Sequence, residues 1–368
     1  MVQAIKKFKG RPVRAVIDCA AFQNNIEIAQ QLAPSARVLT VIKADGYGHG
    51  LIKMAESAGA KAVLAVATAE EAKRLISAGI KNTIWVLEGP FSDTCLALSA
   101  KHPIVWVVHS FWQLDLFKTQ SGDQQLKVCL KFDTGMHRLG FSDHQVKGAL
   151  EMLGQLPYVQ LEASMSHFAG SDWPDSEAVQ QQMQCFDRLI EVYGLEKIPQ
   201  TLANSGGVLF YEQSHRDWVR PGIMLYGGMP NEHLRAQDFD LQPVMRFESA
   251  VMSLRQVAKG ESVGYGATWT AERESVIAMV AGGYGDGYPR YAPNGTPVVV
   301  AGQIASLAGR VSMDMLAIDV TDLDGVAIGD EVELWGKYIS VDQIAALSGT
   351  ISYALLTGVT ARVPRVYQ

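Results

Sequence analysis

Residues 36–50, ARVLTVIKADGYGHG, join an apolar run rich in β-branched residues to a loop punctuated by glycines. Further apolar runs follow up to residue 227, and amphipathic stretches such as AEEAKRLISAGI (residues 69–80) separate most of them. These runs are KAVLAVAT, NTIWVLEG, HPIVWVVH, LKVCLKFD, YVQLEASMSHF, QTLAN and WVRPGIMLYG. Apolar strands that alternate with helices are typical of a parallel sheet covered on both faces. About eight such units favour a closed (β/α)8 barrel of the TIM type, with a doubly wound open sheet as the alternative.

Lys43 ends the first of these runs, where burial should lower the pKa of its ammonium group. A lysine with a lowered pKa can act as a nucleophile or hold a Schiff base. In the following loop, Gly46 and Gly48 should let backbone amides approach an anion beside Tyr47. A lysine for an aldehyde beside an anion-binding loop predicts pyridoxal 5'-phosphate as cofactor. The alternative for this segment is a lysine that extends to solvent before an ordinary glycine-rich turn.

Polar residues collect where the predicted strands end. They are Lys43, Lys131, Asp133, Ser166, His167, Asn204, Ser205 and Arg220. A parallel barrel brings these carboxyl ends to one face, which is where barrel enzymes carry their chemistry. The last two strand–helix units of the predicted barrel supply small residues and free backbone amides, which suit the binding of a phosphate.

After about Leu241 the pattern changes to strand-like runs without long helices, separated by Gly, Asp, Asn and Pro turns. We therefore predict a barrel domain at residues 1–240 and a mainly-β domain at residues 241–368. A short helix is expected near residues 341–347. This region also holds the motifs VGYGATW, GGYGDGYPR, GRVSMDM and ARVPR.

The chain has 368 residues, of which 48% are hydrophobic and 19% charged, and a formal net charge of −6. Acidic and basic residues are interspersed, so the pattern points to neither nucleic acid nor an anionic membrane. The basic cluster of Lys6, Lys7, Lys9 and Arg11 is typical of a solubilising N-terminal arm. No apolar run is long enough to span a bilayer and no secretory signal is evident, so we predict a cytoplasmic location. The four cysteines lack metal-ligand spacing and are expected to be free thiols, and no metal site is predicted.

Several motifs in order make the chain resemble the alanine racemase family from Val13 to Val366. They are VIKADGYGHG, LKFDTGMHRLGF, SHFA, ANSGG, WVRPGIMLYG, VGYGATW, GYGDGYPR and GRVSMDM. The resemblance implies a pyridoxal-phosphate isomerase that interconverts L- and D-alanine, with an N-terminal barrel and a C-terminal β-domain. It also implies a head-to-tail homodimer in which each active site takes residues from the partner's β-domain. The D-alanine would supply cell-wall peptidoglycan, or the enzyme would serve alanine catabolism.

Within this resemblance, Lys43 matches the lysine that holds the cofactor, and Tyr265 matches a second base delivered from the other subunit. Inversion of a stereocentre needs proton removal on one face and proton return on the other, which two opposed bases provide. A phenol is a weak base at neutral pH, so Tyr265 needs help. His167 and Arg220 match partners that could supply a positive field and a hydrogen-bond chain.

Arg220 also matches the arginine that faces the cofactor's pyridine nitrogen. A guanidinium does not readily give up a proton, so it would leave this nitrogen unprotonated and limit transamination. Arg138 matches the arginine near the substrate carboxylate. Lys131 matches a position that is often carbamylated in the family to brace that arginine, and its alternative is a plain lysine paired with Asp133.

The remaining implied site residues fall into two groups. The cofactor and its phosphate are matched by Tyr47, Asn204, Ser205, Gly222, Ile223 and Tyr353. Substrate contact from the partner is matched by Met313, and an entrance tyrosine by Tyr284. Among the departures from the family pattern, KADGYGHG stands for the more usual KANAYGHG, and ANSGG for ANSAA.

Other readings follow from the same motifs. A racemase with wider specificity, for serine or lysine, is one alternative. A related decarboxylase for diaminopimelate or basic amino acids shares the cofactor lysine, but that class lacks the tyrosine of VGYGATW. A non-enzymatic cofactor-carrying protein with the same barrel is disfavoured by the long region after Leu241.

Overall fold

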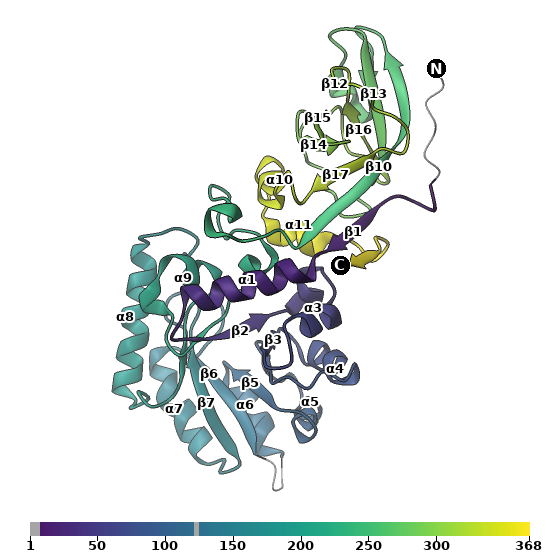
Figure 1. Ribbon diagram of the computed structural model, residues 1–368. Coiled ribbons are helices and arrows are strands. Elements are labelled where there is room, and N and C mark those ends of the chain that lie inside the picture. Colours follow the sequence, from purple (N-terminus) through teal and green to yellow (C-terminus); the bar gives the residue numbers. More distant parts are fainter. Residues whose placement is uncertain (1–7, 121–124) are drawn as a thin grey trace. The chain divides into compact units, whose positions relative to one another are not determined.

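The computed structural model describes residues 8–120 and 125–368, and these form two compact units. The first comprises residues 22–225 and contains a closed barrel of eight parallel strands, which confirms the predicted barrel and excludes the open sheet. Figure 1 shows helices around the outside of these strands. The barrel strands are β2 (Arg37–Val41), β3 (Val63–Val66), β4 (Ile84–Val86), β5 (Ile104–Val108), β6 (Leu126–Lys131), β7 (Val159–Met165), β8 (Gln200–Thr201) and β9 (Trp218–Val219).

Helices and helical turns lie between or beside these strands along the chain, and one of the helices falls on the amphipathic stretch at residues 69–80. The helices are α1 (Cys19–Leu32), α2 (Lys43–Tyr47), α3 (Leu51–Ser57), α4 (Ala69–Ser77), α5 (Asp93–Leu96), α6 (Phe111–Lys118), α7 (Asp143–Gly154), α8 (Glu177–Val192) and α9 (Ser205–Phe210). The 3-10 turns are η1 (Ala97–Ala100), η2 (Glu212–Ser214) and η3 (Ile223–Tyr226). Helix α4 begins with a capping box, in which the Thr68 hydroxyl accepts from the Glu71 amide and the Glu71 carboxylate accepts from the Thr68 amide. Its inner face buries Ala69, Ala72 and Leu75.

The second compact unit comprises the described residues 8–21 and 226–368 and is built on an eight-stranded sheet in the order β13-β16-β15-β14-β17-β10-β1-β18. Its elements are β1 (Arg14–Ile17), β10 (Met245–Val257), β11 (Ser262–Val263), β12 (Trp269–Thr270), β13 (Ser275–Ala281), β14 (Pro297–Val300), β15 (Gln303–Leu307), β16 (Met315–Asp319), β17 (Glu331–Trp335), β18 (Arg365–Tyr367), α10 (Val341–Leu347), α11 (Ser352–Gly358), η4 (Ala236–Phe239) and η5 (Tyr265–Ala267). All pairings in this sheet are antiparallel except that of β1 with β18. The mainly-β fold and the helix at residues 341–347 are therefore as predicted.

The long strand β10 organises this sheet. Its first half pairs with β1 and β17, and after an irregularity between Val251 and Ser253 its second half pairs with β13. Such irregularities bend a strand, so one strand can serve two parts of a sheet. Because β13 also leads through β16, β15, β14 and β17 back to β10, six strands form a closed circuit.

Two features of this unit were not predicted. Strand β1 belongs to this sheet although it comes at the start of the chain. Arg11 is not part of a solvated arm: its guanidinium makes two hydrogen bonds of 2.6 and 2.7 Å with the Asp286 carboxylate. Lys6 and Lys7, from the same predicted arm, lie outside the described residues. Within the described ranges, no helix combines the length and the apolar character needed to cross a membrane.

Candidate active site

The carboxyl ends of the barrel strands carry the predicted chemical groups. Lys43 follows β2 by two residues, Lys131 is the last residue of β6, and His167 follows β7 by two residues. Asn204 follows β8, and Arg220 directly follows β9. In a closed parallel barrel these ends share one face, so the structure brings this predicted set together.

Lys43 lies in an electropositive environment. Burial is the main cause that lowers the pKa of its amine, and the charges of Arg138 and Arg220 lower it further, against the opposing charges of Glu88 and Glu71. A lowered pKa increases the fraction of neutral amine, which is the nucleophilic form.

The backbone after Lys43 turns in the left-handed sense. Four successive residues, Ala44, Asp45, Gly46 and Tyr47, have φ values of 54°, 55°, 64° and 51°. For an L-residue other than glycine this conformation costs about 1–2 kcal/mol. The turn pairs its own amides, because Gly46 donates to the Ile42 carbonyl and Gly48 to the Ala44 carbonyl, both at 2.9 Å. The amides of Gly46 and Gly48 are therefore used within the turn, and the approach of backbone amides to an anion beside Tyr47 stays a prediction.

The buried side chain of His49 supports this turn by hydrogen bonds to its backbone carbonyls. Its Nδ1 lies 3.0 Å from the Gly46 carbonyl and 2.9 Å from the Tyr47 carbonyl. A carbonyl only accepts, so Nδ1 carries the proton and donates to both.

Arg220 is buried and contacts only neutral groups. Its guanidinium donates to the Thr201 hydroxyl at 2.5 Å and to the carbonyls of Ser166 at 2.7 Å and Leu202 at 3.1 Å. Burial lowers its pKa to about 10, so the group stays charged at neutral pH. No carboxylate pairs with it among the residues that the structure describes. The Thr201 contact could not be predicted, because a threonine inside a short strand is unremarkable.

His167 accepts a hydrogen bond from Arg220. The guanidinium nitrogen lies 3.3 Å from His167 Nδ1, which places the imidazole proton on Nε2. Burial, followed by the charges of Arg220, Lys131, Arg138 and Lys43, holds the pKa of His167 well below its usual range. The imidazole is therefore neutral near physiological pH.

The predicted phosphate residues from different strands meet in the barrel unit. The Ser205 hydroxyl accepts from the Gly222 amide at 2.9 Å and from the Met224 amide at 3.4 Å. A Cβ at Gly222 would lie 2.3 Å from the Tyr47 hydroxyl, so only glycine fits there. Ile223 begins the turn η3 directly after this glycine. Hydroxyl groups and small residues thus converge from the segments after β2, β8 and β9.

The ANSGG motif is explained by close packing. Asn204 caps α9, because its side-chain oxygen accepts from the Gly207 amide at 2.9 Å. A Cβ at Gly206 would lie 2.2 Å from the Ser171 carbonyl oxygen, and one at Gly207 would lie 2.8 Å from the Ala203 Cβ. The alanines more usual in the family would not fit this backbone without a shift.

Lys131 is buried and does not pair with Asp133, so that alternative is wrong. The Asp133 carboxylate instead accepts from the amides of Gly135 at 3.1 Å and His137 at 2.9 Å, which fixes the loop that carries Arg138. Burial and then the charges of Arg220, Arg138 and Lys43 lower the pKa of Lys131 to about 8. Arg138 itself is exposed on this loop.

The surface of the β unit carries Tyr265 and Met313, which are predicted to act across a subunit boundary, and Tyr284, which is predicted to lie at the entrance. Tyr265 is 68% exposed in the turn η5, Met313 is 52% exposed before β16, and Tyr284 is 39% exposed after β13. The loops of the last two are joined, because the Tyr284 amide donates to the Ser312 carbonyl at 3.1 Å. Tyr353 lies in α11 of the same unit.

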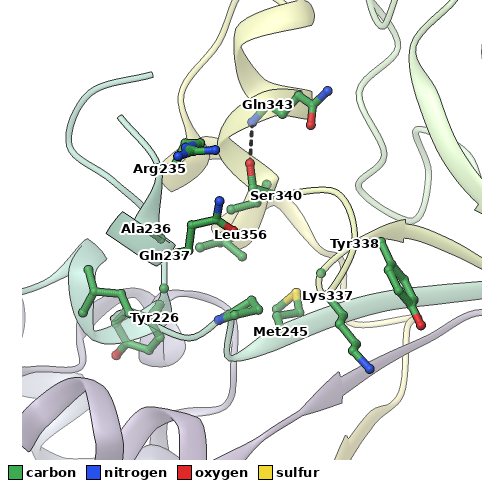
Figure 2. A pocket seen from close by; sticks show the side chains of 15 residues that line it. Tyr226, Arg235, Ala236, Gln237, Met245, Lys337, Tyr338, Ser340, Gln343 and Leu356 are labelled. Carbon is green, nitrogen blue, oxygen red and sulfur yellow. Dashed lines mark hydrogen bonds between the residues drawn. The ribbon is translucent and has the colours of Figure 1, made fainter. Parts of the chain in front are cut away.

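A separate cavity of about 220 Å³ lies within the β unit. Figure 2 shows Met245, Leu356, Ser340 and Lys337 among the side chains around it. No residue of the predicted site lines it, so we do not assign the proposed chemistry to this cavity.

The fold and site define a barrel enzyme with a reactive amine among cationic groups, combined with a β unit that exposes a tyrosine. Residues 17–230 match the profile of the alanine racemase N-terminal domain and residues 244–367 that of the alanine racemase C-terminal domain. The chain belongs to the alanine racemase family.

Individual relatives are similar to this chain over nearly their whole length. The chain is 45% identical to the catabolic alanine racemase of Pseudomonas putida and 44% identical to the biosynthetic alanine racemase of Pseudomonas aeruginosa, covering 97% of this chain and 99% of each relative. The crystal structure of the biosynthetic enzyme from Pseudomonas aeruginosa superimposes with a TM-score of 0.92 at 42% identity, over 98% of this chain and 100% of that one. The decarboxylase and the non-enzymatic readings are therefore set aside.

Proposed function

We propose that this chain interconverts L- and D-alanine with pyridoxal 5'-phosphate, using Lys43 and a partner's Tyr265 as the two bases. Membership of the alanine racemase family supports the reaction and its class, an isomerase. The observation that carries the residue assignment is the cationic cluster at the barrel's strand ends, in which the Lys43 amine has a lowered pKa.

The residues present fit the cofactor. The Gly222 backbone, at which any Cβ would meet the Tyr47 hydroxyl, and the Ser205 hydroxyl form a cradle of small and polar groups that suits a phosphate. Tyr47, Asn204, Ser205, Gly222, Ile223 and Tyr353 would hold the phosphate end, and Lys43 the aldehyde. When bound, pyridoxal phosphate weakens the bond between Cα and hydrogen in the amino acid by withdrawing electrons.

Arg220 would face the pyridine nitrogen and keep it unprotonated. Its hydrogen bonds to Thr201 and to two carbonyls fix the guanidinium, and its pKa of about 10 keeps it charged. Its hydrogen bond to the neutral His167 would form part of a hydrogen-bond chain in the active site. Its positive charge would contribute a positive field there.

The second base requires a homodimer. Tyr265 and Met313 are exposed on the β unit, which supports a role in a neighbouring subunit's active site. Lys43 would move the proton on one face of the substrate and Tyr265 on the other, while Arg138 binds the carboxylate in a bidentate manner. Met313 would contact the substrate and Tyr284 would control the entrance.

Lys131 would carry a carbamate. Because its pKa of about 8 leaves part of the amine neutral at physiological pH, the nitrogen can add to CO2 and release one proton. The resulting negative charge would orient the Arg138 guanidinium. The cationic surroundings of Lys131 favour such an anion.

Relatives of both metabolic roles match equally well, so D-alanine supply for peptidoglycan and alanine catabolism are both proposed roles. The test of the reaction is formation of D-alanine from L-alanine with added pyridoxal phosphate, with L-serine and L-lysine as competing substrates. Racemisation of alanine that disappears in Lys43→Ala supports the proposal. Cofactor binding without turnover of alanine would refute it.

A further inference from the structure

The left-handed turn after Lys43 needs support from outside itself, because three of its members are not glycine. Helix α4 provides this support through two side chains one helical turn apart, Glu71 and Arg74. Both contact the turn at its first two residues, Ala44 and Asp45.

Glu71 binds the backbone of the turn. One carboxylate oxygen accepts from the Ala44 amide at 2.7 Å and from the Asp45 amide at 3.4 Å. The other accepts from the Ala67 amide at 2.9 Å and from the Thr68 amide at 3.4 Å, at the start of α4. One side chain thus ties the segment after β2 to the segment after β3.

Arg74 binds the side chain of the turn. Its guanidinium donates to the Asp45 carboxylate at 2.9 Å, and the same oxygen accepts from the Leu51 amide at 3.2 Å. The carbonyl of Asp45 accepts from the Gly50 amide at 2.8 Å. The aspartate that departs from the family pattern at this position therefore forms an ion pair with Arg74, which a neutral asparagine could not form.

We propose that Glu71 and Arg74 are positioning residues, which hold the left-handed turn and thereby fix the Lys43 amine and the Tyr47 hydroxyl relative to the cofactor. This inference rests on the proposed function for its kinetic consequences, but its structural part does not. Helix α4 is a firm base for the two residues, because its inner face is buried and its first turn is capped. The negative charge of Glu71 also raises the pKa of the Lys43 amine, against the larger lowering caused by burial.

A simple helix cap is the competing role for Glu71, and Thr68→Ala separates the two. This control removes the hydroxyl that caps α4 but leaves the Glu71 carboxylate free to bind the turn. Glu71→Gln keeps one acceptor oxygen and cannot serve both segments. Arg74→Ala, at a half-exposed position, tests the second contact without a buried change.

The first readout is amide hydrogen exchange of the purified protein over residues 41–54, which needs no turnover. We expect faster exchange in Glu71→Gln and Arg74→Ala than in Thr68→Ala. The second readout is activity of the enzyme loaded with pyridoxal phosphate. There we expect kcat to fall about tenfold or more in Glu71→Gln, with KM for alanine nearly unchanged and weaker cofactor retention.

Equal exchange in Glu71→Gln and Thr68→Ala would overturn the proposal, because Glu71 would then act only as a cap. If the variants exchange faster but the wild-type protein does not racemise alanine, only the proposed function is refuted. The structural role of Glu71 and Arg74 would still stand. Restoration of slow exchange by Arg74→Lys, which returns a cation, would support the charge pairing with Asp45.

Discussion

Asp286 is the carboxylate on which the loops of the β unit depend, and its removal should be costly. Its side chain is 0% exposed and accepts two hydrogen bonds from Arg11 and one of 2.8 Å from Arg362. It also accepts from the Gly283 amide at 2.9 Å. Loss of one partner of a buried ion pair costs about 3–5 kcal/mol. Because the Arg11 and Arg362 side chains are 38% and 42% exposed, they can regain water. We therefore expect Asp286→Ala to lower the free energy of unfolding by about 2–4 kcal/mol.

Denaturation of Asp286→Ala and wild type in urea at neutral pH measures this difference. Burial raises the pKa of Asp286, but the bonds from Arg11, Gly283 and Arg362 outweigh burial and lower it. A lowered pKa in the folded state contributes stability above the unfolded pKa of about 4 and loses it as the pH falls through the folded value. The difference in the free energy of unfolding between Asp286→Ala and wild type should therefore shrink below about pH 4.

The matched control is Asp314→Asn, because Asp314 also pairs with Arg362 but its side chain is 51% exposed. An exposed pair contributes about 0–1 kcal/mol. If Asp286→Ala destabilises the protein no more than Asp314→Asn does, the Asp286 cluster does not hold these loops.

Three further predictions concern single titratable groups. Arg220→Glu should slow racemisation and raise transamination, because a carboxyl group can protonate the pyridine nitrogen; unchanged ratios of D-alanine to pyruvate would count against this role. Lys131, with its pKa of about 8, should take up CO2 increasingly between pH 7 and 9, as carbon-13 NMR with labelled bicarbonate would show, and Lys131→Arg should give no such signal. Burial raises the pKa of Asp342 to about 6, so ionisation destabilises the fold and stability should fall as the pH rises from about 4 to 6. Asp342→Asn should lose this dependence in urea titrations, and retention of it would show that another group is responsible.

The barrel could be predicted because its signal is local and repeated. The strands β2 to β6 are short, largely buried runs that can be recognised without a partner from elsewhere in the chain, and polar residues stand at or just after the ends of several strands. The helix at residues 341–347 was also predicted, and the structure begins it with Ser340, whose hydroxyl accepts from the Gln343 amide.

The pairing of strands that are far apart in the chain could not be predicted from the sequence. Strand β1 lies beside β10, more than two hundred residues away, and its short run RAVI resembles the start of the barrel. Arg11 was assigned to a solvated arm for the same reason, since its partner Asp286 is 275 positions later.

The left-handed conformation of the backbone after Lys43 could not be predicted either, although these residues were identified from the sequence as part of the candidate site. Glycines at 46 and 48 suggested open amides, but the left-handed turn uses those amides internally. Ala44 gave no sign of a positive φ, because alanine rarely adopts it. The capping pattern of Thr68 and Glu71 was present in the sequence, yet only the fold shows that Glu71 also reaches Ala44.

In the proposed enzyme, Lys43 of one subunit and Tyr265 of its partner together complete a single active site. Complementation tests it directly: Lys43→Ala and Tyr265→Phe, each inactive alone, are produced together so that mixed dimers form. A mixed dimer has one site with both native residues, so random pairing should restore about a quarter of the wild-type rate of D-alanine formation. Mixed dimers that form but stay inactive would contradict the account, because the two residues would then have to come from the same subunit.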